Sequence, residues 1–139
     1  MKIAVDFDGT IVTHEYPKIG RDIPFAIETL KMLQKEQHQL ILWTVREGDL
    51  LQEAVDYCKN HGLEFYAVNA SYPGETTESA HYSRKIKADM YIDDTSVGGL
   101  PDWGIIYEMV RKGKSMMEVI QEQMETEVPK KAKRKWGIF

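Results

Sequence analysis

The sequence predicts an α/β fold built on a doubly wound, mainly parallel sheet. Apolar stretches typical of strands alternate along the chain with stretches that have the period of amphipathic helices. Such alternation is typical of parallel strands joined by helical crossovers. The chain has 139 residues, of which 42% are hydrophobic, so it is long enough for one domain with a core of its own.

The first predicted strand and helix flank an irregular segment. Residues 2–7, with an apolar centre at residues 3–5, predict the first strand, and residues 10–20, which show no period, are expected to form a loop or a small flap. Asp22 is expected to cap the next helix, because Pro24 then falls near the first turn, where its missing N–H does no harm. The apolar contacts of this helix would come from Phe25, Ile27, Leu30 and Leu33.

A second strand and helix follow at residues 39–62. Residues 39–44, which are apolar from Leu40 to Trp43, predict the strand. The helix is expected to start at Gly48 or Asp49, and Gly62 is expected to stop it. A short third strand over residues 64–68 leads into the polar stretch 69–79. Loops of this length in compact domains tend to be functional.

The last third of the chain begins with a fourth predicted strand, residues 88–92, and a turn over residues 97–101. Residues 103–110 fit a strand or a helix equally well, because their periodicity does not distinguish the two. The sequence Ser115-Met116-Met117-Glu118 has the form of a capping box and predicts a terminal helix to about Val128. We therefore expect one domain over residues 1–128 and a basic tail over residues 129–139.

Two pairs of acidic residues follow predicted strands. Asp6 and Asp8 are one residue apart at the end of the first strand, so they would project to the same side of an extended chain. Two carboxylates that close do not both ionise cheaply without a cation or a shared proton, and a divalent metal held by oxygens would relieve the repulsion. Asp93 and Asp94 follow the fourth strand, and the carboxyl ends of parallel strands meet at one edge of a sheet.

Polar and basic residues are expected at the same edge. Thr44 closes the second strand, with Val45 and Arg46 behind it, and Lys85 and Lys87 precede the fourth strand. A nucleophile, a metal and cations for phosphate oxygens are the groups that phosphoryl transfer needs. The sequence therefore indicates phosphoryl-transfer chemistry.

In the order of these acidic, hydroxyl and basic residues along its sequence, the chain resembles the haloacid dehalogenase-like superfamily, specifically its small phosphatases. Asp6-Phe7-Asp8-Gly9-Thr10 is similar to the first motif of that superfamily, Thr44 to the second, Lys85 to the third and Asp93-Asp94 to the fourth. The resemblance covers residues 2–94, about two thirds of the chain. It implies a Rossmann-like fold and a Mg²⁺-dependent phosphatase.

The resemblance also implies roles for the acidic residues. Asp6 would be the nucleophile that forms an aspartyl-phosphate, and Asp8 would be the general acid and then the base. Asp6, Asp93 and the backbone carbonyl of Asp8 would hold Mg²⁺, and Asp94 would act through water or hold Asp93 in place.

The same resemblance implies that Thr44, Val45 and Lys85 bind the phosphoryl oxygens. We favour Lys85 over Lys87 because Lys85 precedes Asp93 by eight residues, the offset associated with the small members of this superfamily. Arg46 is either an ion-pair partner or a substrate ligand. The alternative function is a phosphate-binding or phospho-acceptor signalling module without turnover.

The intervals between the motifs leave no room for the cap domain that usually selects the substrate in this superfamily. We therefore expect an open site for a small-molecule or macromolecular phosphate ester. Three arrangements are open: a large substrate covers the site itself, a neighbouring copy of the chain covers it, or the specificity for small molecules is loose. Selectivity would come from residues 11–20 and 69–81.

The composition sets further expectations about the surroundings of the protein. The net charge of −4 argues against general nucleic-acid binding, so a nucleic acid is expected only as a phosphorylated substrate. The sequence has no apolar stretch of membrane-spanning length and no signal-peptide layout, and Cys58 is the single cysteine. We expect a cytoplasmic protein.

Overall fold

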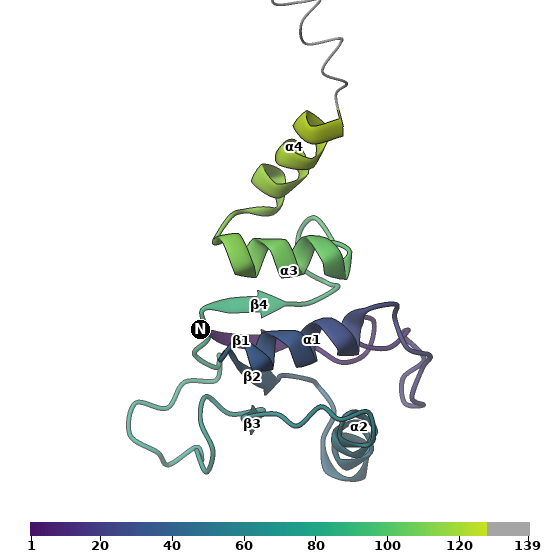
Figure 1. The fold of residues 1–139 in the computed structure, drawn as a ribbon. Coiled ribbons are helices and arrows are strands. Elements are labelled where there is room, and N and C mark those ends of the chain that lie inside the picture. Colours follow the sequence, from purple (N-terminus) through teal and green to yellow (C-terminus); the bar gives the residue numbers. More distant parts are fainter. Residues whose placement is uncertain (128–139) are drawn as a thin grey trace, which may run out of the picture. The chain divides into compact units, whose positions relative to one another are not determined.

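The computed structural model describes residues 1–127 (Figure 1). The predicted basic tail and Val128 lie outside the described residues. The chain divides into two compact units, residues 1–100 and residues 101–139, and each has its own architecture.

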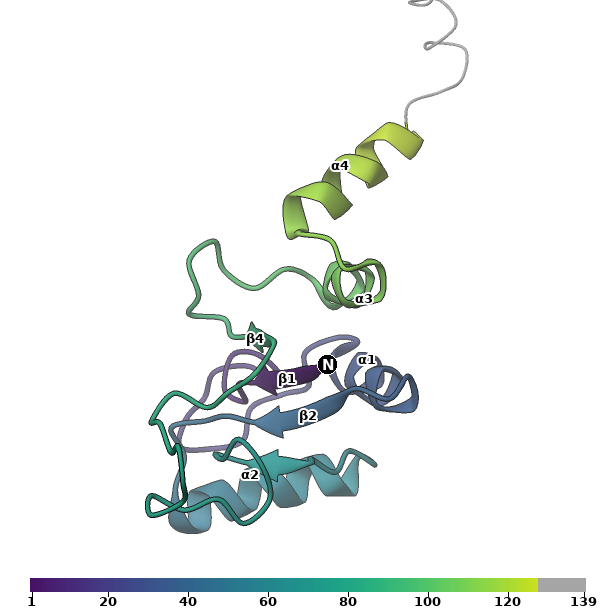
Figure 2. The same ribbon diagram turned by 90° about the vertical axis from the view of Figure 1, so that its left-hand side faces the viewer.

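The first unit contains a four-stranded sheet in which every strand pair is parallel (Figure 2). The strands, in the order β3-β2-β1-β4 across the sheet, are β3 (Ala67–Val68), β2 (Gln39–Leu42), β1 (Lys2–Val5) and β4 (Met90–Ile92). In the central register, Ala4 of β1 lies between Ile41 of β2 and Tyr91 of β4. The α/β class and the parallel sheet are thus confirmed.

Each strand is shorter than its apolar stretch. The predicted strand over residues 2–7 ends at Val5, and the one over residues 39–44 ends at Leu42. The backbone beyond these ends keeps isolated contacts, since the N–H of Asp6 donates to the carbonyl of Ile92 (3.0 Å) and that of Trp43 to Val5 (2.9 Å). The chain therefore leaves the sheet just before the predicted site residues.

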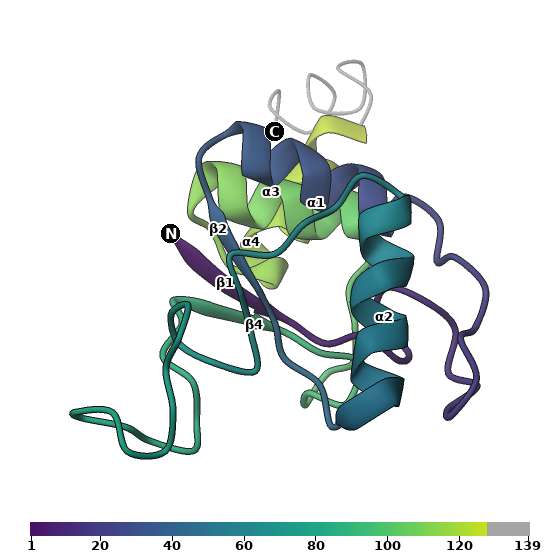
Figure 3. The ribbon, with the colours of Figure 1, turned by 90° about the horizontal axis from the view of Figure 1, so that it is seen from below.

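The two faces of the sheet are covered by different elements. Figure 3 shows α1 (Ala26–Lys35) and α2 (Gly48–Asn60) on one side of the strands and the loop between β3 and β4 on the other. On the helix side, the ring of Phe7 meets Tyr57 of α2 edge to face, with their centroids 5.9 Å apart. On the loop side, small and branched residues of the strands pack on Ile86, and these are Ala4, Ile41 and Ala67.

The predicted start of the first helix is wrong. Helix α1 begins at Ala26, after Phe25, whose backbone is left-handed (φ 68°). Asp22 instead bridges to Val12, and the N–H of Ile23 donates to the carbonyl of Ile11 (3.0 Å). Residues 21–23 therefore pair with residues 11–13 and are not available to a helix. The predictions for α2 are confirmed, because it starts at Gly48 and is followed by the left-handed Gly62.

The second unit contains two helices, α3 (Trp103–Lys112) and α4 (Met116–Glu127). Residues 103–110, which the sequence left open, are helical because Asp102 accepts a cap hydrogen bond from the N–H of Ile105 (2.9 Å) and the left-handed Gly113 ends the helix. The predicted cap of α4 is confirmed by a hydrogen bond from the N–H of Glu118 to the Ser115 hydroxyl (3.2 Å).

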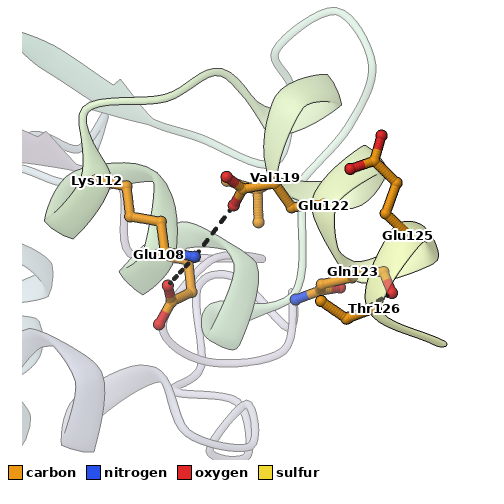
Figure 4. A pocket seen from close by; sticks show the side chains of 7 residues that line it. All are labelled: Glu108, Lys112, Val119, Glu122, Gln123, Glu125 and Thr126. Atoms are coloured by element: carbon orange, nitrogen blue, oxygen red, sulfur yellow. Dashed lines mark hydrogen bonds and ion pairs between the residues drawn. The ribbon is translucent and has the colours of Figure 1, made fainter. Parts of the chain in front are cut away.

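An ion-pair cluster joins the two helices of this unit (Figure 4). Lys112 of α3 lies 3.2 Å from Glu108 and 3.1 Å from Glu122 of α4, and Lys114 also pairs with Glu122. Glu122 raises the pKa of Lys112 and Glu108 raises it further. Glu108, Lys112 and Glu122 line a cleft of about 480 Å³. Within residues 1–127, no helix has the length and apolar character needed to cross a membrane.

Candidate active site

Three carboxylates meet at the carboxyl edge of the sheet. Asp6 follows β1 and Asp93 and Asp94 follow β4, and these two strands are direct neighbours. One oxygen from each carboxylate lies within 4.8 Å of the other two. The parallel pairing therefore brings together residues nearly ninety positions apart in the sequence.

A threonine and a glycine of the first motif hold this cluster in place. The Thr10 hydroxyl accepts a hydrogen bond from the N–H of Asp94 (3.1 Å) and can donate to the carboxylate of Asp94 (3.1 Å) or of Asp6 (3.4 Å). Gly9 has a left-handed backbone (φ +85°), and a Cβ at this position would lie 2.3 Å from Oδ2 of Asp94. Only glycine therefore lets the Asp94 carboxylate approach the turn after β1.

Hydrogen bonds from the turn that follows Asp93 orient the carboxylate of Asp93 itself. Oδ1 of Asp93 accepts hydrogen bonds from the N–H of Thr95 (2.9 Å) and from its hydroxyl (2.8 Å). The sequence analysis missed Thr95, although a hydroxyl two residues after an aspartate is a recognisable turn signal.

The electrostatics of this cluster suit a cation. The pKa of Asp6 is raised to about 7, mainly by burial and with smaller contributions from Asp94 and Asp93, against an opposing backbone hydrogen bond from Phe7. Within residues 1–127, no lysine, arginine or histidine forms an ion pair with any of the three carboxylates. Hard oxygen ligands of this kind and number fit Mg²⁺. The residues present therefore fit the metal that the resemblance implies.

Asp8 is in a different environment from Asp6. Its side chain, only 6% exposed, accepts two hydrogen bonds of 2.8 Å from the Nε and Nη2 atoms of Arg46, which is 1% exposed. This pair raises the pKa of Arg46. The side chain of Asp8 is therefore outside the carboxylate cluster, and Asp94, expected to act through water or to hold Asp93, contributes an oxygen to the cluster itself. Of the two roles left open for Arg46, the structure shows the ion pair.

A cavity of about 210 Å³ opens onto these acids. Its lining comprises Asp6, Asp8, His14, Tyr16, Val45, Asp93, Asp94 and Thr95. Val45 is 87% exposed, which places an apolar side chain at the rim of an otherwise polar cavity. The predicted residues Asp6, Asp8, Val45, Asp93 and Asp94 thus share one cavity.

The other two predicted phosphate ligands, Thr44 and Lys85, do not line it among the described residues. The N–H of Thr44 donates to Asn69 (2.8 Å), and its hydroxyl accepts from the N–H of Arg46 (3.1 Å), so Thr44 shapes the turn after β2. The ammonium group of Lys85 lies 4.9 Å from the ring centroid of Tyr91. Lys87 donates to the carbonyl of His81 (3.0 Å), so neither lysine is placed at the acids.

The fold and the site together define an α/β protein with an acidic, cation-compatible cavity at the carboxyl edge of a parallel sheet. The solved structure of a conserved protein from Bacteroides thetaiotaomicron is similar, with 61% sequence identity and a TM-score of 0.81. The similarity covers 86% of this chain and 96% of that one. The chain therefore belongs to the same family as that conserved protein. No protein-family model and no curated protein matches the chain.

Proposed function

We propose that this protein is a Mg²⁺-dependent phosphatase of the haloacid dehalogenase-like superfamily that hydrolyses a phosphate monoester. The observation that carries the proposal is the carboxylate cluster of Asp6, Asp93 and Asp94, placed beside Asp8 in one cavity. A cluster of acids alone is common on protein surfaces. Here it coincides with the motif order of that superfamily and with the carboxyl ends of adjacent parallel strands.

In the first step, an oxygen of Asp6 attacks the phosphorus atom and the bond from phosphorus to the leaving oxygen breaks. The Asp8 carboxyl group gives the leaving oxygen a proton. Each carboxyl oxygen has two lone pairs, so the hydrogen bonds from Arg46 still leave room for this proton. The products are a free alcohol and a phosphorylated Asp6.

In the second step, Asp8 accepts a proton from water as that water attacks the phosphorus, and the bond from Asp6 to phosphorus breaks. Inorganic phosphate leaves and Asp6 returns to its starting form. Asp6, Asp93 and Asp94 would hold Mg²⁺, which supplies positive charge to neutralise the phosphoryl oxygens when it is bound.

The architecture supports a site without a cap domain. Between β1 and β2 lie residues 11–23, whose two ends pair with each other, and helix α1. Between β2 and β4 lie α2, β3 and one loop. Selectivity would then come from residues that line the cavity mouth, such as Tyr16, His14 and Val45. Tyr72 and His81, which were expected to contribute, are not among the described lining residues.

The second candidate function is a phospho-acceptor or phosphate-binding module without turnover. It is favoured by one observation, because neither Lys85 nor Lys87 lines the cavity among the described residues. A cavity with few cations would stabilise the developing charge of the transition state poorly and would therefore turn a phosphoryl group over slowly.

The two functions are separated by following phosphate in time. Purified protein is given a panel of phosphate monoesters with Mg²⁺, and released phosphate is compared with phosphate bound to the protein. A phosphatase releases many phosphates per chain and is inactive in excess chelator. A phospho-acceptor is labelled at most once per chain, and Asp6→Asn abolishes both signals.

A further inference from the structure

One buried guanidinium group joins three separate segments of the first unit. Arg46, in the turn after β2, holds both carboxylate oxygens of Asp8 after β1 through two 2.8 Å hydrogen bonds. The same Nη2 atom donates to the carbonyl of Lys18 (3.0 Å). Its Nη1 atom donates to the carbonyl of Leu50 in the first turn of α2 (3.3 Å).

Aromatic rings complete this arrangement. The guanidinium carbon of Arg46 lies 5.2 Å from the ring centroids of both Phe7 and Tyr16. Tyr16 and Lys18 belong to residues 13–20, which we call the flap. Arg46 therefore contacts the flap in two ways, by stacking over the ring of Tyr16 and by donating a hydrogen bond to the main-chain carbonyl of Lys18.

The base of the flap is closed independently of Arg46. The N–H of Thr13 donates to the carbonyl of Arg21 (2.8 Å), and the N–H of Arg21 donates to the Thr13 hydroxyl (2.9 Å). A Cβ on Gly20 would lie 2.0 Å from the carbonyl oxygen of Thr13, so the two ends of the flap are in close contact. The contacts that Arg46 makes with the flap lie instead at its tip, on Tyr16 and Lys18.

We propose that Arg46 is a positioning residue that fixes the Asp8 carboxylate and the flap tip to one another. The flap is then a fixed wall of the cavity, with Tyr16 set against the same guanidinium that orients Asp8. The catalytic part of this inference rests on the proposed phosphatase function, whereas the tethering of the flap does not. Arg46 does not line the cavity, so it acts on a substrate only through Asp8 and Tyr16.

This arrangement predicts which part of catalysis depends on Arg46. Asp8 transfers a proton to the leaving oxygen, so its orientation matters most for esters whose leaving group needs that proton. An alkyl phosphate has such a leaving group, and 2,4-dinitrophenyl phosphate does not. Loss of orientation should therefore lower kcat for the alkyl ester much more than for the dinitrophenyl ester.

The kinetic test compares Arg46→Met, Arg46→Lys and the control Arg21→Met. Arg21 is exposed and also lies beside the flap, so its substitution removes the same charge without touching Asp8. For Arg46→Met we expect kcat on an alkyl phosphate to fall at least ~10²-fold. We expect a decrease on the dinitrophenyl ester of less than about tenfold, with KM changed by less than about threefold on both. Arg46→Lys should recover part of kcat, and Arg21→Met should match the parent.

The structural test measures the tether directly through trypsin cleavage. The carbonyl of Lys18 accepts the hydrogen bond from Arg46 and also belongs to the peptide bond that trypsin cuts after this residue. In Arg46→Met, cleavage after Lys18 should become at least about tenfold faster relative to cleavage after Lys35, at the end of α1. The ratio removes any effect of general destabilisation, and Arg46→Lys keeps a buried charge if Arg46→Met does not fold.

Two results would overturn the inference. One is equal loss of kcat on both esters, which would mean that Arg46 serves only the stability of the fold. The other is an unchanged cleavage ratio at Lys18, which would mean that the flap tip is held by other contacts. If the parent protein hydrolyses no ester at all, the proposed function fails, and the cleavage ratio still decides whether Arg46 tethers the flap.

Discussion

Replacement of Gly9 by alanine tests the acidic cluster with a single methyl group. The new Cβ would lie 2.3 Å from Oδ2 and 2.7 Å from Cγ of Asp94. Comfortable non-bonded contacts begin near 3.5 Å, so the carboxylate must retreat by about 1 Å. Metal sites tolerate errors of only about 0.2 Å in ligand distances, so the displaced Asp94 would no longer serve as a ligand.

Two effects of Gly9→Ala can be separated. The left-handed backbone (φ +85°) strains any residue with a Cβ by about 1–2 kcal/mol, which lowers the free energy of unfolding. The loss of Asp94 from the cluster should raise the Kd for Mg²⁺ at least about 10-fold, because the loss of even a supporting group outside the metal's ligands costs about 10–100-fold in affinity. The first effect is general, and the second is specific to this site.

Gly74→Ala is the matched control. Gly74 has nearly the same backbone angle (φ +83°), but a Cβ there meets nothing within 4 Å. We expect both variants to lose similar stability in metal-free urea unfolding, whereas only Gly9→Ala should bind Mg²⁺ more weakly in calorimetry. Equal Mg²⁺ affinities for the two variants would show that Asp94 does not hold the metal.

Three further predictions concern the proposed chemistry. Asp6→Asn should abolish turnover and leave the fold intact, whereas Asp8→Asn should lower turnover by at least ~10²-fold, as measured by phosphate release from folded protein. The pKa of Asp6 is raised from 3.8 to about 7, so between these pH values the native state binds more protons than the unfolded chain. The free energy of unfolding without metal should therefore fall as the pH rises from about 4 to 7. Mg²⁺ needs the ionised carboxylate, so the rise in Tm that Mg²⁺ causes should grow as the pH passes 7, and a pH-independent rise would contradict this assignment. Lys85→Ala should weaken phosphate binding more than Lys87→Ala if Lys85 reaches the substrate, and the opposite order of phosphate affinities would assign that role to Lys87.

The alternation of apolar stretches and helical periods was sufficient to predict the fold class. Parallel strands need crossovers, so four apolar stretches separated by helices or long loops predict a parallel sheet. The same rule predicts that Asp6 and Asp93 lie at one edge, because neighbouring parallel strands end on the same side. The local apolar pattern overestimated each strand. The first two strands end earlier than predicted, at Val5 and Leu42, where their neighbours stop pairing, whereas the fourth starts later, at Met90, and ends at Ile92 as predicted.

Local sequence also failed where long-range pairing competes with it. Asp22 and Pro24 form a reasonable start for a helix by themselves. Residues 21–23 instead pair with residues 11–13 at the base of the flap, so α1 starts only at Ala26. Helix α3 shows the converse case, because its periodicity was ambiguous while its boundaries are set by a local cap at Asp102 and a glycine at 113.

The pattern of the sequence was enough to predict the α/β class and the acids at one sheet edge. The folded structure was needed to show how those acids divide, with Asp94 joining Asp6 and Asp93, and Asp8 held by Arg46. Arg46 lies 38 residues from Asp8, and no periodicity or local motif reports a contact at that separation. A hydrophobic pattern records which residues are buried, whereas the partner of a buried charge depends on which strand ends the folded sheet places side by side.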